Sequence, residues 1–181
     1  MCLPFANFFQ IQTANITHNL GGIFGIGTSL DYYYKKNNYI SLGAGTVSNH
    51  TMAERIGPGL FEDATSDFIN VRNNFNIGSF DFGYGVNVAK YHWDIFSNDS
   101  AHTHNPASAG DHKDDIGIGL SFISQFRFGE YFRMGIIYQP NVLNISTKSE
   151  FDYQHYIGLE LLWKIRLGRI EVPNSTKCHF N

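Results

Sequence analysis

The sequence lacks the features by which most membrane and metal-binding proteins are recognised. No stretch of about 18 consecutive apolar residues occurs, which excludes a transmembrane helix. The two cysteines, Cys2 and Cys178, have neither metal-binding nor redox spacing, and the sequence leaves open whether they pair. Charged residues make up only 16%, and the formal net charge of −3 gives no reason to expect nucleic acid as a partner.

The first ten residues also lack the signature of a secretory signal. Met1 to Gln10 contains no Lys or Arg, and its apolar patch is interrupted by Pro4 and Asn7. A signal peptide starts with basic residues and continues with an unbroken apolar run. Either the protein is not exported, or this chain begins after its true signal peptide. We favour the second interpretation.

The chain does contain strict alternation of apolar and polar residues, most clearly between Tyr153 and Leu167. Successive side chains of a strand point to opposite faces, so this segment predicts one apolar face and one polar face. The segment is too long for an ordinary strand of a small soluble sheet, where about five or six residues is typical. Its length suits a tilted strand that crosses a bilayer.

Seven further segments show the same alternation, separated by turn residues. The predicted strands before the last one are 8–17, 20–34, 39–48, 67–76, 80–96, 116–128 and 132–145. The first of these has the weakest pattern. In the segment 80–96 the alternation slips by one residue after Lys90, which predicts either a β-bulge near Ala89 and Lys90 or a strand that has left the membrane.

The connections between these segments alternate between short and long, as in an up-and-down transmembrane barrel with tight periplasmic turns and longer outer loops. We therefore predict an all-β protein, an antiparallel transmembrane β-barrel of about eight strands. Residues 1–167 form the single barrel domain in this prediction, and 168–181 form an irregular C-terminal tail.

The orientation of the two faces separates a membrane barrel from a soluble one. A lipocalin-like carrier of an apolar small molecule would turn its apolar set inward. Here the polar set is mainly Gly, Ser and Asn, which suits a narrow interior better than a soluble surface. The apolar set is uniformly large, so a barrel of about eight strands could hardly enclose it. We therefore expect the apolar set to face lipid.

Aromatic residues gather near both ends of the predicted strands, where they would form girdles at the two lipid–water boundaries. The predicted girdle residues are Tyr32, Tyr34, Tyr39 and Trp163 near the short turns, and Trp93 and Tyr153, with Tyr91 and Phe151, at the outer side.

The last strand is similar to the C-terminal assembly signal of the small outer-membrane β-barrel proteins of Gram-negative bacteria. In the segment 156–163, Gly158, Leu161 and Trp163 stand at matching places. Two features depart from that family: Tyr156 stands where a polar residue is usual, and the chain continues beyond the strand. The resemblance covers roughly Phe8 to Leu167 and implies insertion by the outer-membrane assembly machinery.

Charged residues of the polar set are expected inside the barrel, where opposite signs can pair and keep the lumen closed. The predicted ion-pair network consists of Asp31, Arg72, Asp81, Arg127, Arg133, Glu160 and Lys164. A lumen filled by such side chains conducts poorly, so a porin is not predicted.

Histidines supply two further candidates for chemistry. His102 and His104, with His112, lie among Asp residues in the loop Ser97 to Asp115, and could bind Zn²⁺ or Cu²⁺, although a hydrated polar loop explains them as well. His155 and His92 are the available bases if the barrel were a lipid-modifying enzyme, but no nucleophile stands at a recognisable spacing.

The sequence therefore predicts an integral outer-membrane barrel with a structural, adhesion or surface-binding role. No catalytic residue and no cofactor is expected. The predicted partners are outer-membrane lipid and the assembly machinery, and the sequence does not identify a surface ligand.

Overall fold

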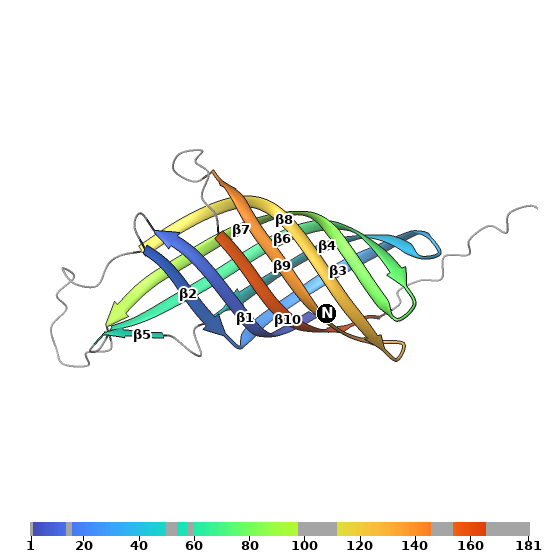
Figure 1. Ribbon diagram of the computed structural model, residues 1–181, viewed down its shortest axis with the longest axis horizontal. Helices are drawn as coiled ribbons and strands as arrows, with labels where there is room; N and C mark the ends of the chain where they lie inside the picture. The colour runs from blue at the N-terminus through green and yellow to red at the C-terminus, as the bar shows by residue number, and fades with distance from the viewer. Residues whose placement is uncertain are drawn as a thin grey trace, which may run out of the picture.

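A computed structural model describes residues 2–13, 16–49, 54–57, 60–97, 112–145 and 154–165 of the chain. Nearly all of these residues lie in antiparallel β-strands (Figure 1). The strands are β1 (Cys2–Thr13), β2 (Ile16–Gly22), β3 (Phe24–Lys35), β4 (Asn38–Ser48), β5 (Glu54–Gly57), β6 (Leu60–Ile77), β7 (Phe80–Ser97), β8 (His112–Phe128), β9 (Phe132–Asn144) and β10 (Gln154–Trp163).

The sheet closes on itself because β10 pairs with β1, the first strand of the chain. The ring contains eight strands. β2 and β3 act as one strand interrupted at Ile23: β1 pairs with both in a single continuous register, from Thr13 opposite Ile16 to Cys2 opposite Gly27. β5 lies outside the ring and pairs only with β6. The weakly patterned first strand predicted over 8–17 overlaps β1 only in part: β1 begins at Cys2 and closes the barrel, whereas residues 16–17 already belong to β2.

The apolar side chains face outward, as β10 illustrates. Ile157, Leu159 and Trp163 are exposed, whereas Tyr156 and Glu160 are buried in the lumen. The other strands follow the same rule at most positions, with Leu30 63% exposed and Asn87 only 1% exposed, although some apolar side chains such as Val47 and Ile137 are buried in the lumen. A lipocalin-like carrier needs the opposite orientation, so this alternative does not fit the structure.

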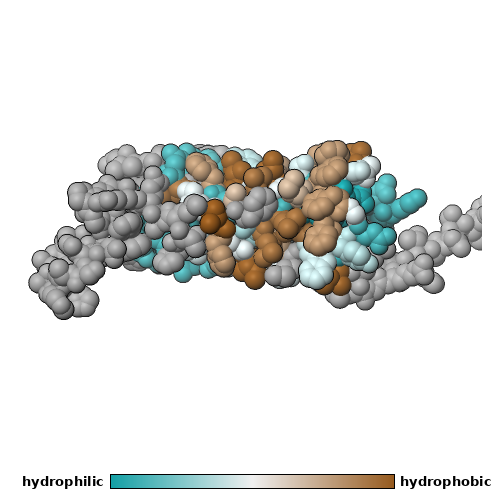
Figure 2. Space-filling model, turned by 90° about the horizontal axis from the view of Figure 1, so that it is seen from below, coloured by the Kyte–Doolittle hydropathy of each residue, from teal (hydrophilic) through white to brown (hydrophobic). Residues whose placement is uncertain are grey.

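The outward-facing apolar residues form a continuous band around the barrel. Figure 2 shows this band in brown across the middle of the molecule, with hydrophilic residues toward both ends. A soluble monomer rarely exposes a contiguous apolar patch of more than a few hundred Å², and a band of this kind indicates contact with lipid. None of the described residues forms a helix that is long and apolar enough to cross a membrane.

Three tight turns join strands at one end of the barrel, on the right of Figure 1. They connect β3 to β4, β6 to β7 and β8 to β9. Gly78 and Gly129 have backbone φ angles of 60° and 87°, in the left-handed region that favours glycine, so they permit the latter two turns. The strand ends Thr13, Ser48, Ser97 and Asn144 lie at the opposite end of the barrel, which we call the outer end.

Glycines of the inward-facing set make room for large neighbours in the lumen. A Cβ atom at Gly158 would collide with the hydroxyl group of Tyr156, and one at Gly83 would collide with the side-chain amide of Asn74. The abundance of glycine on the polar face thus reflects the narrow interior of an eight-stranded barrel.

Of the two explanations offered for the slip after Lys90, a bulge near Ala89 and Lys90 is absent, and a strand that leaves the membrane fits the structure. The pairing of β6 with β7 continues without a register shift from Leu60 opposite Ser97 to Ile77 opposite Phe80. Tyr91 and Trp93 therefore point into the lumen, where they are 2% and 4% exposed. The hydropathy pattern slips because the surroundings of the strand change, from lipid to water, while the direction of its side chains stays regular.

The outer parts of β6, β7 and β8 extend beyond the apolar band. On their outward face the apolar residues give way to charged ones, namely Asp67, Lys90 and Asp114. We call this extension of the three strands the outer wall. The sequence assigned residues 49–66 to a loop, but β5 and the first part of β6 lie there, because strands outside the bilayer lack the lipid-facing pattern. The predicted tail 168–181 lies outside the described residues.

A cationic substitution distinguishes the band from the outer wall. Leu42→Arg, in the middle of β4, should reduce the free energy of unfolding by about 2–4 kcal/mol, because arginine is costly when it faces the centre of a bilayer. Thr65→Arg, on the outward face of the outer wall, should change it by only ~0–1 kcal/mol. Equilibrium unfolding in phospholipid vesicles measures both values, and equal effects would contradict the proposed position of the membrane.

Candidate functional site

The lumen near the tight turns contains two ion pairs joined by one tyrosine. Arg133 of β9 pairs with Asp81 of β7, and both side chains are almost completely buried. Lys164, directly after β10, pairs with Asp31 of β3, which also accepts a hydrogen bond from Ser41. We call these groups, with the tyrosine described next, the lower cluster.

Tyr39 of β4 connects the two ion pairs. Its hydroxyl oxygen accepts hydrogen bonds from Arg133 Nη1 at 3.2 Å and from Lys164 Nζ at 3.3 Å. The Lys164 ammonium group also lies 4.3 Å from the centre of the Tyr39 ring, and Tyr33 stacks on that ring at 4.7 Å. A buried charge is costly unless it is paired and hydrogen-bonded, so Tyr39 helps these cations to remain in the lumen.

Arg127 lies at the edge of the lower cluster. Its Nε atom is 3.6 Å from an oxygen of the Asp81 carboxylate, and its Nη2 atom donates a hydrogen bond to the carbonyl oxygen of Gly78 at 2.6 Å. This side chain is partly exposed. It therefore links the buried ion pair to the β6–β7 turn.

Glu160 and Arg72 occupy the lumen above the lower cluster. Glu160 accepts hydrogen bonds from Gln125 at 3.2 Å and from the thiol of Cys2 at 2.8 Å. Arg72 is 6% exposed, and its Nε and Nη1 atoms have no hydrogen-bond partner within the part of the chain that the structure describes. Thus the structure brings six of the seven predicted network residues into polar contacts, but it does not give Arg72 an ion pair among the described residues.

A layer of large side chains crosses the lumen toward the outer end. Tyr91, Trp93 and Tyr156 belong to a buried apolar cluster together with Leu20 and Val47. We call this cluster the aromatic layer. Sequence reasoning missed it, since the inward set was read as small and polar. The regular alternation of β7 from Asp81 onward was the signal that could have revealed Tyr91 and Trp93.

Two members of the aromatic layer, Tyr156 and Trp93, have hydrogen-bond partners in the lumen. The Tyr156 hydroxyl group donates to the side chain of Asn7 at 2.9 Å, and Asn7 donates in turn to the carbonyl oxygen of Phe24 at 2.7 Å. The indole N–H of Trp93 donates to the carboxylate of Glu62. The unusual Tyr156 of the last strand therefore fills the lumen and connects β10 to β1 and β3.

Three residues assigned to the aromatic girdles, Tyr39, Trp93 and Tyr91, lie in the lumen instead. Tyr39 is 2% exposed in the lower cluster and Trp93 is 4% exposed in the aromatic layer, so neither can contact lipid. Both follow the inward phase of their strands. Tyr32, Tyr34 and Trp163 are exposed on the outside, at 63%, 40% and 49%.

The outer girdle has no described member. Tyr91, like Trp93, points inward, and Tyr153 and Phe151 lie outside the described residues. The girdle at the tight-turn end is further lined by stacked rings, with Phe132 lying 6.2 Å from Trp163 and 6.1 Å from Phe128 between ring centres.

The suggested metal site falls mostly on residues that are not described. His102 and His104 lie outside the described residues, and His112 begins β8 without a described side chain. Within the described part of the chain, no group of three or more His, Cys, Asp or Glu side chains is arranged to hold a metal ion.

The two histidines considered as catalytic bases have different surroundings. His92 lies on the outer wall, with Nδ1 2.8 Å from a carboxylate oxygen of Asp114 and Nε2 2.6 Å from one of Asp94. His155 lies on the outward face of β10, where the rings of Phe8 and Tyr138 are 6.3 and 6.0 Å away. Both nitrogens of His92 thus face carboxylates, an arrangement that favours a structural imidazolium over a catalytic base.

Comparisons with known proteins agree with this architecture. No protein-family model and no curated protein sequence matches the chain. Among solved structures, Neisserial surface protein A is similar with a TM-score of 0.56 and 10% identity, over 91% of this chain and 96% of that chain. Ail, the attachment invasion locus protein of Yersinia pestis, is similar in its complex with the heparin analogue sucrose octasulfate, with a TM-score of 0.57 and 8% identity, over 90% of this chain and 94% of that chain.

Both proteins are small eight-stranded outer-membrane β-barrel proteins of Gram-negative bacteria. The chain has the fold of this group. The fold that the sequence predicted, an up-and-down antiparallel barrel of about eight strands, is therefore confirmed. At such low identity the likeness concerns the fold alone, so the roles of individual residues depend on the geometry described above.

Removal of one hydroxyl group tests the position of Tyr39. Tyr39→Phe should lower the free energy of unfolding by about 1.5 kcal/mol, because Arg133 and Lys164 each lose a buried hydrogen-bond acceptor. Tyr32→Phe, on the lipid-facing side, serves as the control and should have little effect. Denaturant unfolding in vesicles compares the free energies of unfolding of the two variants. Equal changes would contradict the position of Tyr39 in the lumen.

The outer wall should lose local stability at alkaline pH. The hydrogen bond with Asp114, followed by that with Asp94, raises the pKa of His92 above its ordinary value of 6.5. A raised pKa in the folded state means that protonated His92 stabilises the fold fully below about pH 6.5, and that this contribution disappears as the pH rises through the higher folded value.

Hydrogen exchange measures this effect. After correction for intrinsic rates, the amides at the outer ends of β7 and β8 should become less protected between pH 6 and pH 8.5. In His92→Asn the same amides should show no such change, because the titrating group is gone. Equal pH dependence in both proteins would rule out His92 as the cause.

Proposed function

We propose that the protein is an integral outer-membrane barrel with a structural or surface-binding role and a closed lumen. The observation that carries the proposal is the combination of an apolar band on the outside with a buried polar network inside. A soluble protein would have to expose the band to water at a large cost. A bilayer removes that cost.

The closed lumen follows from the two layers that cross it. The lower cluster joins β3, β4, β7, β9 and the end of β10. The aromatic layer lies nearer the outer end of the barrel and joins side chains that include those of β2, β4, β7 and β10. An eight-stranded barrel has an interior just wide enough to be filled by side chains. We therefore do not expect solutes to pass through this lumen.

The outer wall supports the surface-binding part of the role. β6, β7 and β8 contain 18, 18 and 17 residues, whereas β4 contains 11 and β10 contains 10. The longer strands carry a paired sheet beyond the membrane, which presents a firm surface. Binding surfaces are commonly placed on loops and edges that a rigid scaffold holds in position.

The charge of the outer wall argues against a polyanionic partner. Its outward face carries Asp67, Asp94 and Asp114, while Lys90 is partly neutralised by Asp114 at 3.7 Å. The heparin analogue bound by Ail is polyanionic. A neutral or cationic surface partner matches the described charges of this chain better.

The proposal also includes insertion by the outer-membrane assembly machinery. The terminal segment that resembles the assembly signal forms β10, and β10 pairs with β1 from Gln10 opposite His155 to Cys2 opposite Leu162. The strand that carries this resemblance is thus also the strand that completes the ring.

Fractionation and gel mobility test the proposal together. The full-length protein should sediment with outer membranes, resist extraction by salt, and migrate differently in detergent gels before and after boiling, because a closed barrel survives the detergent until it is heated. In planar bilayers it should produce no steady conductance. Recovery in the soluble fraction would refute the membrane location, whereas stable open channels would refute only the closed lumen.

A further inference from the structure

At one short stretch of β8 the usual pattern is exchanged: an apolar side chain faces the lumen and a polar one faces outward, although the side-chain directions still alternate. Ile123 points into the lumen and is 5% exposed, whereas Ser124 faces outward within the apolar band. On the neighbouring strands Ser124 lies opposite Phe82 of β7 and Ile136 of β9. A small polar side chain thus stands between two large apolar ones at a depth where the barrel faces lipid.

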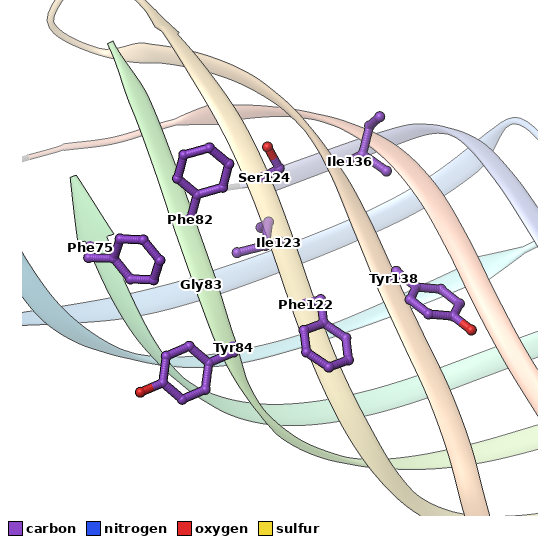
Figure 3. Close-up of a pocket in the computed structure, with 9 residues that line it drawn as sticks. All are labelled: Phe75, Phe82, Gly83, Tyr84, Phe122, Ile123, Ser124, Ile136 and Tyr138. Atoms are coloured by element: carbon purple, nitrogen blue, oxygen red, sulfur yellow. The ribbon is translucent and has the colours of Figure 1, made fainter. Parts of the chain in front are cut away.

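The short side chain leaves a hollow in the outward, lipid-facing surface of the barrel. This groove has a volume of about 460 Å³ and is lined by residues from β6, β7, β8 and β9 (Figure 3). The residues that line it are Phe75, Phe82, Gly83, Tyr84, Phe122, Ile123, Ser124, Ile136 and Tyr138. The groove is open on its outward side.

Two pairs of aromatic rings flank the groove. Phe75 and Phe82 stack with their centres 5.8 Å apart, and Phe122 and Tyr138 stack at 6.3 Å. In Figure 3 the hydroxyl groups of Tyr84 and Tyr138 point away from the space between the rings. The Tyr84 hydroxyl group accepts a hydrogen bond from Asn73 at 3.4 Å, so its polar end is engaged outside the groove. The groove is therefore almost entirely apolar.

The end of the groove at Phe75 lies beside basic residues. Phe75 pairs with Asn38 of β4, Asn38 pairs on its other side with Lys35 at the end of β3, and Lys36 follows in the turn. Both lysines are exposed at the tight-turn end, where the apolar band stops. An apolar groove that runs toward cationic side chains at the membrane surface has the chemistry of a phospholipid site: acyl chain within the band, phosphate at the boundary.

The size of the groove argues for a lipid and against another protein. A stable interface between two copies involves about 20–30 residues on each side, whereas only nine residues line this groove. The groove is also continuous with the band that faces lipid. We propose that it holds one acyl chain of a phospholipid from the leaflet on the tight-turn side, with the phosphate near Lys35 and Lys36. This inference rests on the proposed membrane location.

Native mass spectrometry of the full chain in detergent, titrated with phosphatidylglycerol, tests the site. The wild-type barrel should retain one phospholipid at low concentrations. Ser124→Phe fills the groove and should weaken this binding about tenfold, which corresponds to a loss of roughly 55 Å² of apolar contact. Ala44→Phe is the matched control, since Ala44 is a small outward-facing residue of β4 that does not line the groove. It should bind like the wild type.

Two further measurements are needed: one distinguishes binding of the acyl chain from binding of the phosphate, and one distinguishes a loss of binding from a failure to fold. Diacylglycerol with the same chains should bind more weakly than phosphatidylglycerol, and Lys35→Glu/Lys36→Glu should remove that difference. The mobility shift on boiling shows that each variant has folded. Equal lipid retention by Ser124→Phe and Ala44→Phe would overturn the site, even if the protein fractionates with the outer membrane. If the wild type were a dimer and only Ser124→Phe were a monomer, the occupant of the groove would be a second copy of the chain, which would likewise overturn the lipid site.

Discussion

The pairing of β10 with β1 is the constraint on which the rest of the structure depends. A bilayer offers no water to the backbone, so every strand within it must pair on both sides, and only a closed ring achieves this for a sheet. Once the ring is closed with eight strands, the interior is narrow and one face of every strand points into it. The small inward residues and the outward apolar band are both consequences of that closure.

The narrow interior explains why the buried charges stay close together. Tyr39 accepts hydrogen bonds from two cations whose carboxylate partners come from different strands, so the lower cluster fixes β4, β7, β9 and the end of β10 relative to one another. Such a network contributes less net stability than its number of contacts suggests, because desolvation of the charges opposes their attraction. It specifies which strands face one another across the lumen.

Much of this fold could be predicted from the sequence because strand alternation is a local property. The regular pattern of β10 indicated both its faces correctly, and the inward positions of Asp81 and Arg133 followed from the same rule. The wrong placements concern aromatic residues, which were assigned to the membrane boundary by residue type although the alternation of their strands points inward. Tyr39 directly precedes the outward Ile40, so its phase is inward, yet its aromatic ring suggested the membrane boundary.

Other features could not be predicted from a local pattern. The contact of Tyr156 with Asn7 and the link between Tyr39 and Arg133 join residues far apart in the sequence. The outer parts of β6 and β8 were missed because their outward faces meet water, where no lipid-facing signal exists, whereas the outer part of β7 lay within the predicted strand 80–96.

The unbroken ladder between β6 and β7 has a mechanical consequence. The two strands remain paired over 18 positions, from the outer wall through the apolar band to the tight turn. A tensile force applied to the outer end along the strands loads the inter-strand hydrogen bonds in shear, so that many of them resist it at once. A force on the exposed part of the molecule is thereby transmitted into the embedded cylinder, with no hinge between them.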